Sequence, residues 1–153
     1  MLDRRFIGKT YPAALNEVEK NAIRRFADAL GDPNPLYWDE EVAKQAGYRS
    51  LLAPPTFPAT FGGSEDVVAL LGLGNRSVLV GEQSYEYHEP ICAGDRVMVT
   101  SRVVDIYEKV GTGGTMDFAV IEDEGRDEKN NLIYRGRRTM VVRPPRIEGA
   151  PVL

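Results

Sequence analysis

The amino-acid sequence predicts an α+β domain, with helices in its first half and an antiparallel sheet in its second half. Apolar residues recur at helical spacing between positions 16 and 30, which is typical of an amphipathic helix. From Asn75 onward, apolar and polar residues alternate in short segments separated by turns, which is typical of strands. Strands joined in sequence by short turns pair antiparallel, and such a sheet must be covered on at least one face.

Three helices are expected before the sheet. Their ranges are residues 16–30, 39–46 and about 58–71. Asn16 is the expected N-cap of the first helix, with Glu19 three residues later as in a capping box, and Asp39 is the cap of the second. Gly31 and Gly47 are the expected ends of these two helices. The third segment is rich in apolar residues, so we expect it to be buried.

The strands of the sheet are expected at residues 78–88, 96–107, 115–121 and 132–142. In the first of these, Tyr85 and Tyr87 fall on one face and the acidic residues on the other. The charged stretch from Glu122 to Asn131 is expected to be a polar hairpin loop. Residues 1–143 are interpreted as one domain, and the tail at 144–153, with its prolines, as irregular structure.

Composition excludes several classes of function. The chain has 153 residues, one Cys and one His, so an internal disulfide is excluded and a transition-metal site is not expected. Its net charge of −4 argues against a nucleic-acid partner. No apolar run is long enough to span a membrane, and the N-terminus does not resemble a signal peptide. A reducing, cytoplasmic location is therefore expected.

Two proline clusters mark the expected functional region. Five of the ten prolines in the chain lie between positions 33 and 58. Most of them belong to the segments Asp32-Pro33-Asn34-Pro35 and Pro54-Pro55-Thr56-Phe57. Proline fixes φ and disfavours helix in the preceding residue, so this region adopts defined extended and turn conformations. Asp32 is then a carboxylate on a stiff loop, as a general acid–base group requires.

The same region resembles the hydratase motif of the MaoC-like dehydratases, which reads G-D-x-N-P-[L/V]-H and is followed by a small-residue A-H-G turn. The matching residues are Gly31, Asp32, Asn34, Pro35 and Leu36. Tyr37 stands at the position of the family's catalytic His, and Ala53-Pro54-Pro55 stands at the A-H-G turn. The resemblance is strongest to the dehydratase domain of type I fatty acid synthases and covers nearly the whole chain.

The resemblance implies a hotdog fold, in which an antiparallel sheet wraps around one long central helix, here residues 58–71. It also implies dimers that pair edge to edge, with sites at the subunit interface. The implied reaction is reversible hydration of a 2-enoyl thioester, carried on coenzyme A or an acyl carrier protein, with neither metal nor redox cofactor. In the family, an Asp and a His activate one water, and a backbone N–H stabilises the thioester oxygen.

By this resemblance Asp32 is the acid–base carboxylate, although an Asp before proline is also a common turn residue. Asn34 is expected to fix the loop. Tyr37 is expected to pack against its neighbours or to orient the substrate rather than to transfer protons. A phenol has a reference pKa of about 10 and stays protonated at neutral pH. The only histidine, His88, is expected to have a structural role.

The second departure from the family concerns the thioester-binding turn. Pro55 at the position of the family's glycine has no N–H, and Thr56 is the nearest replacement donor. Phe57 and Phe61 are expected in the core or in the wall of an acyl pocket. The basic run Arg135-Gly136-Arg137-Arg138 is either a solvent-facing strand segment or a contact for an anionic cofactor tail or an acidic carrier protein.

Several molecular roles follow. The chain is either a hydratase centred on Asp32, or the substrate-holding half of a heterodimer whose partner carries an intact D-x-N-P-x-H motif. The missing His and the missing N–H favour the second role. A homodimer would be the assembly in the first case. A hotdog acyl-CoA thioesterase and a non-catalytic acyl-thioester binding module are the alternatives, because one fold supports several functions.

Overall fold

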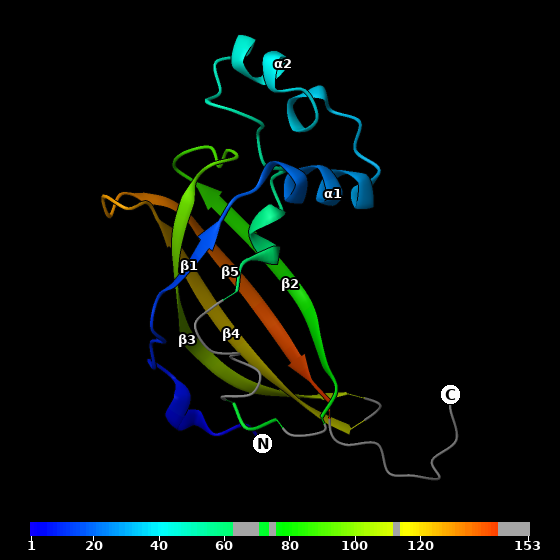
Figure 1. Ribbon diagram of the computed structural model, residues 1–153. Helices are drawn as coiled ribbons and strands as arrows, with labels where there is room; N and C mark the ends of the chain where they lie inside the picture. The colour runs from blue at the N-terminus through cyan, green and yellow to red at the C-terminus, as the bar shows by residue number, and fades with distance from the viewer. Residues whose placement is uncertain (63–70, 74–75, 112–113, 144–153) are drawn as a thin grey trace.

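The computed structural model describes residues 1–62, 71–73, 76–111 and 114–143. It contains one antiparallel sheet of five strands in the order β1-β3-β4-β5-β2. The strands are β1 (Ala14–Glu17), β2 (Val78–Tyr87), β3 (Arg96–Gly111), β4 (Gly114–Arg126) and β5 (Leu132–Val142). Figure 1 shows α1 and α2 grouped at one end of this sheet. The predicted arrangement of helices first and sheet second is confirmed, with the short β1 as an addition.

The pairing of β2 differs from the simple sequential order. The turn at residues 90–95 joins β2 to β3, yet β2 pairs with β5, for example Tyr87 with Tyr134. Only β3, β4 and β5 pair in sequence order. This partner is chosen by contacts distant in sequence, because the Tyr85, Tyr87 and Tyr134 rings pack together with centroids 6.1–6.2 Å apart.

Strand β4 continues through half of the stretch that was predicted to be a loop. It ends at Arg126, and the loop comprises only residues 127–131. The prediction was wrong because charged residues in a strand can lie on its solvent face. Here Glu122 contacts Arg137 at 2.5 Å and Glu124 contacts Arg135 at 3.2 Å. Cross-strand pairs of opposite charge stabilise a sheet.

Three of the four residues predicted to begin or end the first two helices are confirmed. Helix α1 (Lys20–Leu30) ends at Gly31, whose left-handed φ of 66° favours glycine. Helix α2 (Glu40–Gln45) begins after Asp39, whose side chain accepts hydrogen bonds from two backbone N–H groups of the first turn. Gly47 follows α2 with a φ of 96°. Both helices are shorter than predicted, but Gly31, Asp39 and Gly47 lie at the helix ends that the sequence predicts.

Asn16 does not cap α1, contrary to prediction. It lies in β1, and the cap position belongs to Glu19, which makes no side-chain capping bond. The Asn16 side chain instead donates to the Gly62 carbonyl and accepts from the Gly62 N–H, both at 3.0 Å. This amide therefore pairs with the backbone that follows the second proline cluster, 46 residues away.

The third predicted helix does not run unbroken from Pro58. A 3-10 helix, η3, covers Phe57–Thr60 and ends at Phe61, whose backbone is extended. Pro58 in its first turn has no N–H to donate. The Phe57 carbonyl accepts a hydrogen bond from the Thr60 hydroxyl. Residues 63–70 of the predicted helix lie outside the described residues, as does the tail at 144–153.

The inner face of the sheet, which packs against the helices and loops, carries two apolar clusters. The first joins Ile23 and Ala27 of α1 to Val97 and Val99 of β3. The second lies further along the sheet, where Leu2 and Tyr11 near the N-terminus and Leu73 cover the strands. In the part of the chain that the structure describes, every helix is too short or too polar to cross a lipid bilayer.

Tyr134 lies flat against the sheet over Gly125, and this contact gives a stability prediction. A Cβ at Gly125 would lie 2.1 Å from the Tyr134 ring. Gly125→Ala should therefore lower the free energy of unfolding by about 1–3 kcal/mol, because the buried ring must move, as measured by urea denaturation. Gly111→Ala is the control, since its Cβ would make only ordinary contacts, with Met116 at 3.6 Å and the Gly114 carbonyl at 4.0 Å. Equal stability of the two variants would contradict this packing.

Candidate functional site

Asp32 and Asn34 fix the first proline cluster through their own side chains. The Asp32 carboxylate accepts the Asn34 N–H at 3.0 Å, and the Asn34 side chain accepts the Leu36 N–H at 3.1 Å. Asn34 thereby caps the 3-10 helix η2 (Pro35–Tyr37). Both side chains are half-buried. One oxygen of Asp32 is used in this turn, so the carboxylate is held in one orientation while its other oxygen has no hydrogen bond in the described chain.

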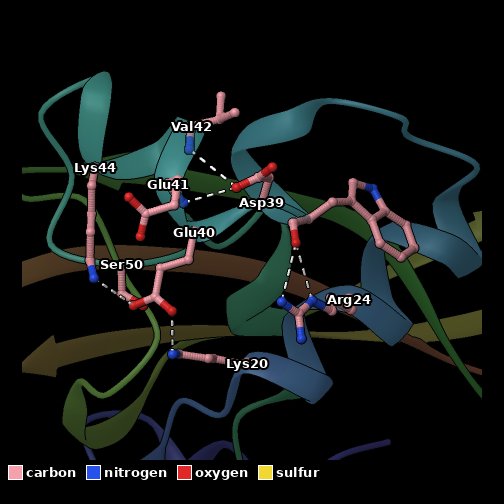
Figure 2. A network of polar contacts seen from close by, with 9 residues as sticks. Lys20, Arg24, Asp39, Glu40, Glu41, Val42, Lys44 and Ser50 are labelled. Carbon is pink, nitrogen blue, oxygen red and sulfur yellow. Dashed lines mark hydrogen bonds and ion pairs between the residues drawn. The ribbon is translucent and has the colours of Figure 1, made fainter.

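Trp38 and Arg24 tie this loop to α1. The Trp38 indole N–H donates to the Asp32 carbonyl at 3.0 Å. The Arg24 guanidinium donates twice to the Trp38 carbonyl, at 3.2 and 3.3 Å (Figure 2). The Asp32 N–H also donates to the Ala27 carbonyl at 3.0 Å, so the loop is bonded at both ends to a helix whose inner face is in the core. This role of Arg24 could not be predicted from the sequence, because its partner is a backbone carbonyl 14 residues away.

A second polar contact joins α1 to α2. Glu40 of α2 pairs with Lys20 of α1 and with Lys44 one turn later, and it accepts a hydrogen bond from Ser50 (Figure 2). Hydrogen bonds from Lys20 and then Lys44 lower the pKa of Glu40 to about 2. Glu40 therefore links three segments around the Asp32 loop through its ionised form.

Tyr37 is buried, with only 5% of its surface exposed. Burial raises the pKa of its phenol, the nearby Asp32 charge raises it further, and a hydrogen bond with Asn34 acts in the opposite direction. The phenol therefore keeps its proton at neutral pH. Tyr37 therefore lies near Asp32 as a packed, neutral phenol.

The second proline cluster lies between the Asp32 loop and the sheet. The Leu52 N–H donates to the Leu36 carbonyl at 3.0 Å, and the Ala53 N–H donates to the Ile91 carbonyl at 2.8 Å. Pro54 is buried and Pro55 is exposed. These hydrogen bonds bring the two predicted clusters together into one site.

Few backbone donors remain in this turn. The two prolines have no N–H, and the Phe57 N–H is bonded to the Pro54 carbonyl at 2.9 Å. Thr56 is exposed, and its N–H has no acceptor among the described residues. Thr56 is thus the residue that offers a free backbone donor next to the prolines, at the position predicted for a replacement donor.

Aromatic rings form one side of the site. Phe57 is buried and packs edge-on against Phe26 of α1 and against Phe61, with centroids 5.5 and 5.7 Å apart. Phe61 in turn contacts Tyr134 at 6.2 Å. The Tyr87 hydroxyl donates to the Pro55 carbonyl. Phe57 and Phe61 were predicted in the core or in the wall of an acyl pocket. The contact of Tyr134 with these rings was not predicted, because Tyr134 is distant from them in the sequence.

Other predicted candidates lie elsewhere. The His88 side chain is 40% exposed and contacts Glu86 at 3.3 Å, on the polar face of the strand end. In the basic run, Arg135 and Arg137 are paired with acidic residues of β4 on the outer face, as the solvent-facing interpretation expects. Among the described residues no cluster of His, Cys, Asp or Glu could hold a metal ion.

Comparison with known proteins identifies the family. Residues 5–135 match the family described as "FAS1-like, dehydratase domain region". The chain belongs to this FAS1-like dehydratase family. It is 39% identical over 147 residues to the UPF0336 protein of Streptomyces avermitilis, covering 93% of this chain and 95% of that relative. The resemblance inferred from the Asp32 motif is thereby confirmed at the level of the family.

Solved structures of this dehydratase family share the fold. The HadBC (3R-hydroxyacyl-ACP dehydratase) complex from Mycobacterium tuberculosis superposes with a TM-score of 0.73 at 21% identity, covering 89% of this chain and 96% of that chain. A MaoC-like dehydratase gives a TM-score of 0.77 at 24% identity, covering 90% of this chain and 42% of that chain. The hotdog fold predicted from the motif is confirmed by these structures.

The Glu40 contacts predict a pH-dependent stability. A carboxylate whose folded pKa is lowered to about 2 from 4.5 stabilises the fold above pH 4.5, and this stabilisation is lost as the pH falls toward 2. Glu40→Gln should therefore lower the melting temperature at neutral pH and have little effect near pH 2. Glu41→Gln, at an exposed position of the same helix, is the control. A pH-independent effect of Glu40→Gln would contradict the ionic link.

Proposed function

We propose that this protein takes part in the reversible hydration of 2-enoyl thioesters to 3-hydroxyacyl thioesters, as the substrate-holding subunit of a heterodimer. The acyl group is carried on coenzyme A or an acyl carrier protein. The partner is a second hotdog subunit with an intact D-x-N-P-x-H motif. The observation that carries this proposal is the buried, protonated Tyr37 at the histidine position beside an otherwise well-formed Asp32 loop.

The chemistry of hydration explains why Tyr37 matters. The oxygen of a water bonds to C3 of the enoyl group while a proton from that water is lost to a base, and C2 receives a proton from an acid. Such positioned proton transfers contribute roughly 10²–10⁴-fold to the rate. Asp32 can supply one of these groups, but a phenol with a raised pKa is a poor base. An Asp–His pair on the partner would supply both.

The thioester oxygen also needs a donor while negative charge develops on it. Pro54 and Pro55 have no N–H, and the Phe57 N–H is already bonded. Thr56 could bind a substrate oxygen with its N–H, but it does so from an exposed position. These features suit binding of the thioester better than stabilisation of its enolate.

The aromatic side of the site supports the substrate-holding role. Phe61 is partly exposed next to the proline turn and packs against the buried Phe57, and Pro55 and Thr56 border it on the exposed side. Burial of an acyl chain against such surface contributes about 25 cal/mol per Å². We assign these four residues to binding the acyl thioester, and Asp32, Asn34 and Tyr37 to the loop that positions it.

The free edge of β2 supports a second hotdog subunit as the partner. β2 is an edge strand, and its Leu79 and Val80 are 48% and 59% exposed. An exposed apolar edge strand favours pairing with another chain. The HadBC structure bears the name of a two-component dehydratase complex, and pairing of this kind would complete the site across the interface.

The isolated chain should bind a 2-enoyl thioester but hydrate it at least about 10²-fold more slowly than an ordinary turnover on the order of 10 s⁻¹. Calorimetry measures binding, and loss of the enoyl absorbance measures hydration. Addition of a hotdog subunit with the intact motif should restore turnover and form a complex on size exclusion. Release of free thiol would indicate a thioesterase instead, and fast hydration by the isolated chain would show that Asp32 suffices.

Asp32→Asn preserves the shape of the loop and removes its negative charge. In the heterodimer this change should leave turnover within about a few-fold, since the partner carries the proton transfers, whereas replacing the partner's motif histidine should reduce turnover by about 10²-fold or more. Steady-state kinetics of the two complexes make the comparison. A large loss from Asp32→Asn with an untouched partner motif would assign catalysis to this chain.

A further inference from the structure

A strip of polar side chains crosses the middle of the inner face of the sheet. This inner strip comprises Gln83 and Tyr85 of β2, Ser101 of β3, Asp123 of β4 and Arg138 of β5. In the sheet register Ser101 lies opposite Asp123, and Gln83 lies opposite Arg138. The rows on both sides of the strip belong to the two apolar clusters. Gln83 is exposed, Ser101 is buried, and the other three are partly buried. The buried polar groups are costly unless they are bonded.

Most of the inner strip is bonded internally. The Ser101 hydroxyl donates to the Asp123 carboxylate at 2.5 Å, and the Gln83 amide donates to the Tyr85 hydroxyl. Gly136 lies between Asp123 and Tyr85 in the register and adds no side chain between them. Burial and then the Asp123 charge raise the pKa of Tyr85, so the phenol stays neutral.

Arg138 is the exception. Its Nη1 lies 3.7 Å from the Asp123 carboxylate, which is an ion pair too long for a hydrogen bond. Its Nε–H is buried and has no acceptor in the described part of the chain. A buried donor without an acceptor costs about 1–3 kcal/mol. An acceptor supplied by a ligand would remove this cost.

The charges of the inner strip indicate the kind of acceptor. Arg138 and Asp123 compensate each other, so the strip has no net positive charge to attract an anion. A carboxylate on the ligand would also be repelled by Asp123. A neutral oxygen, such as that of a ketone or a hydroxyl group, accepts from Arg138 without this repulsion.

The inner strip is also connected to the proposed acyl-binding surface. Tyr85 contacts Tyr134 with centroids 6.1 Å apart, and Tyr134 contacts Phe61 at 6.2 Å. We infer that the substrates are thioesters whose acyl chain bears a second oxygen, a keto or hydroxyl group beyond the C3 position at which hydration occurs, and that Arg138 binds this oxygen. This inference rests on the proposed function and makes Arg138 a specificity-determining residue.

The test compares saturated acyl-CoA thioesters of one chain length by isothermal titration calorimetry, using the protein together with any hotdog subunit that purifies with it. One ligand has a plain alkyl chain, a second set has one keto oxygen at successive carbons beyond C3, and a third ends in a carboxylate. One keto analogue should bind about tenfold more tightly than the alkyl ligand, since a hydrogen bond to a charged donor is worth about 1.5–3 kcal/mol. The carboxylate analogue should show no such gain.

Arg138→Met should remove the preference for the keto analogue and leave binding of the alkyl ligand unchanged. Arg138→Lys, which keeps the charge beside Asp123 but has no Nε–H, should lose the preference as well and serves if the Met variant does not fold. Arg137→Met is the matched control, because Arg137 is paired with Glu122 on the outer face. Its preference should equal that of the unsubstituted protein.

Four outcomes overturn the inference. The first two are equal binding of the alkyl and keto ligands, and tighter binding of the carboxylate analogue than of the alkyl ligand. The third is a preference for the keto ligand that persists in both Arg138 variants. The fourth is release of the partner subunit by these variants. The last result would mean that the partner supplies the acceptor. Failure of every thioester to bind would instead overturn the proposed function on which the inference rests.

Discussion

The short segment from Leu51 to Pro54 is the connection on which the site depends. It is buried between the Asp32 loop and the turn at residues 90–95. A buried backbone must find partners for its N–H and C=O groups. The Leu52 N–H bonds to the loop through the Leu36 carbonyl, and the Ala53 N–H bonds toward the sheet through the Ile91 carbonyl. Both proline clusters are thereby fixed relative to one another without belonging to one regular element.

The prolines of this site fix its backbone conformation but remove hydrogen-bond donors. Each proline sets φ and removes one N–H, so the turn at Pro54 and Pro55 is stiff and poor in groups that could bind a developing oxyanion. Tyr37 has a similar consequence on the other side, since its buried phenol fills the loop without offering a base. The same substitutions that weaken proton transfer thus preserve a well-defined surface. This combination is what a subunit that holds a substrate needs.

Local signals in the sequence predicted local structure correctly, and signals that depend on distant partners did not. Asp39 and Gly31 act on their own neighbours, so their capping roles were readable from the sequence. Asn16 looked equally like a cap, but its partner is Gly62. Motif residues such as Asp32 were identified by the family pattern, whereas Arg24 and Tyr134 required the folded arrangement. The strand in the charged stretch after Ile121 was missed because its salt-bridge partners lie on β5.

The basic run of β5 illustrates how alternation gives neighbouring residues different environments. Successive side chains of a strand point to opposite faces, so Arg135 and Arg137 lie on the outer face, where Glu124 and Glu122 neutralise them. Arg138 lies on the inner face, between the two apolar clusters, with a buried donor that the described chain does not satisfy. A run that composition alone would treat as one basic patch is therefore divided by the pleat of the strand. Two arginines pair with acidic residues across the sheet, and the third is the residue to which we assign the second oxygen of the acyl chain.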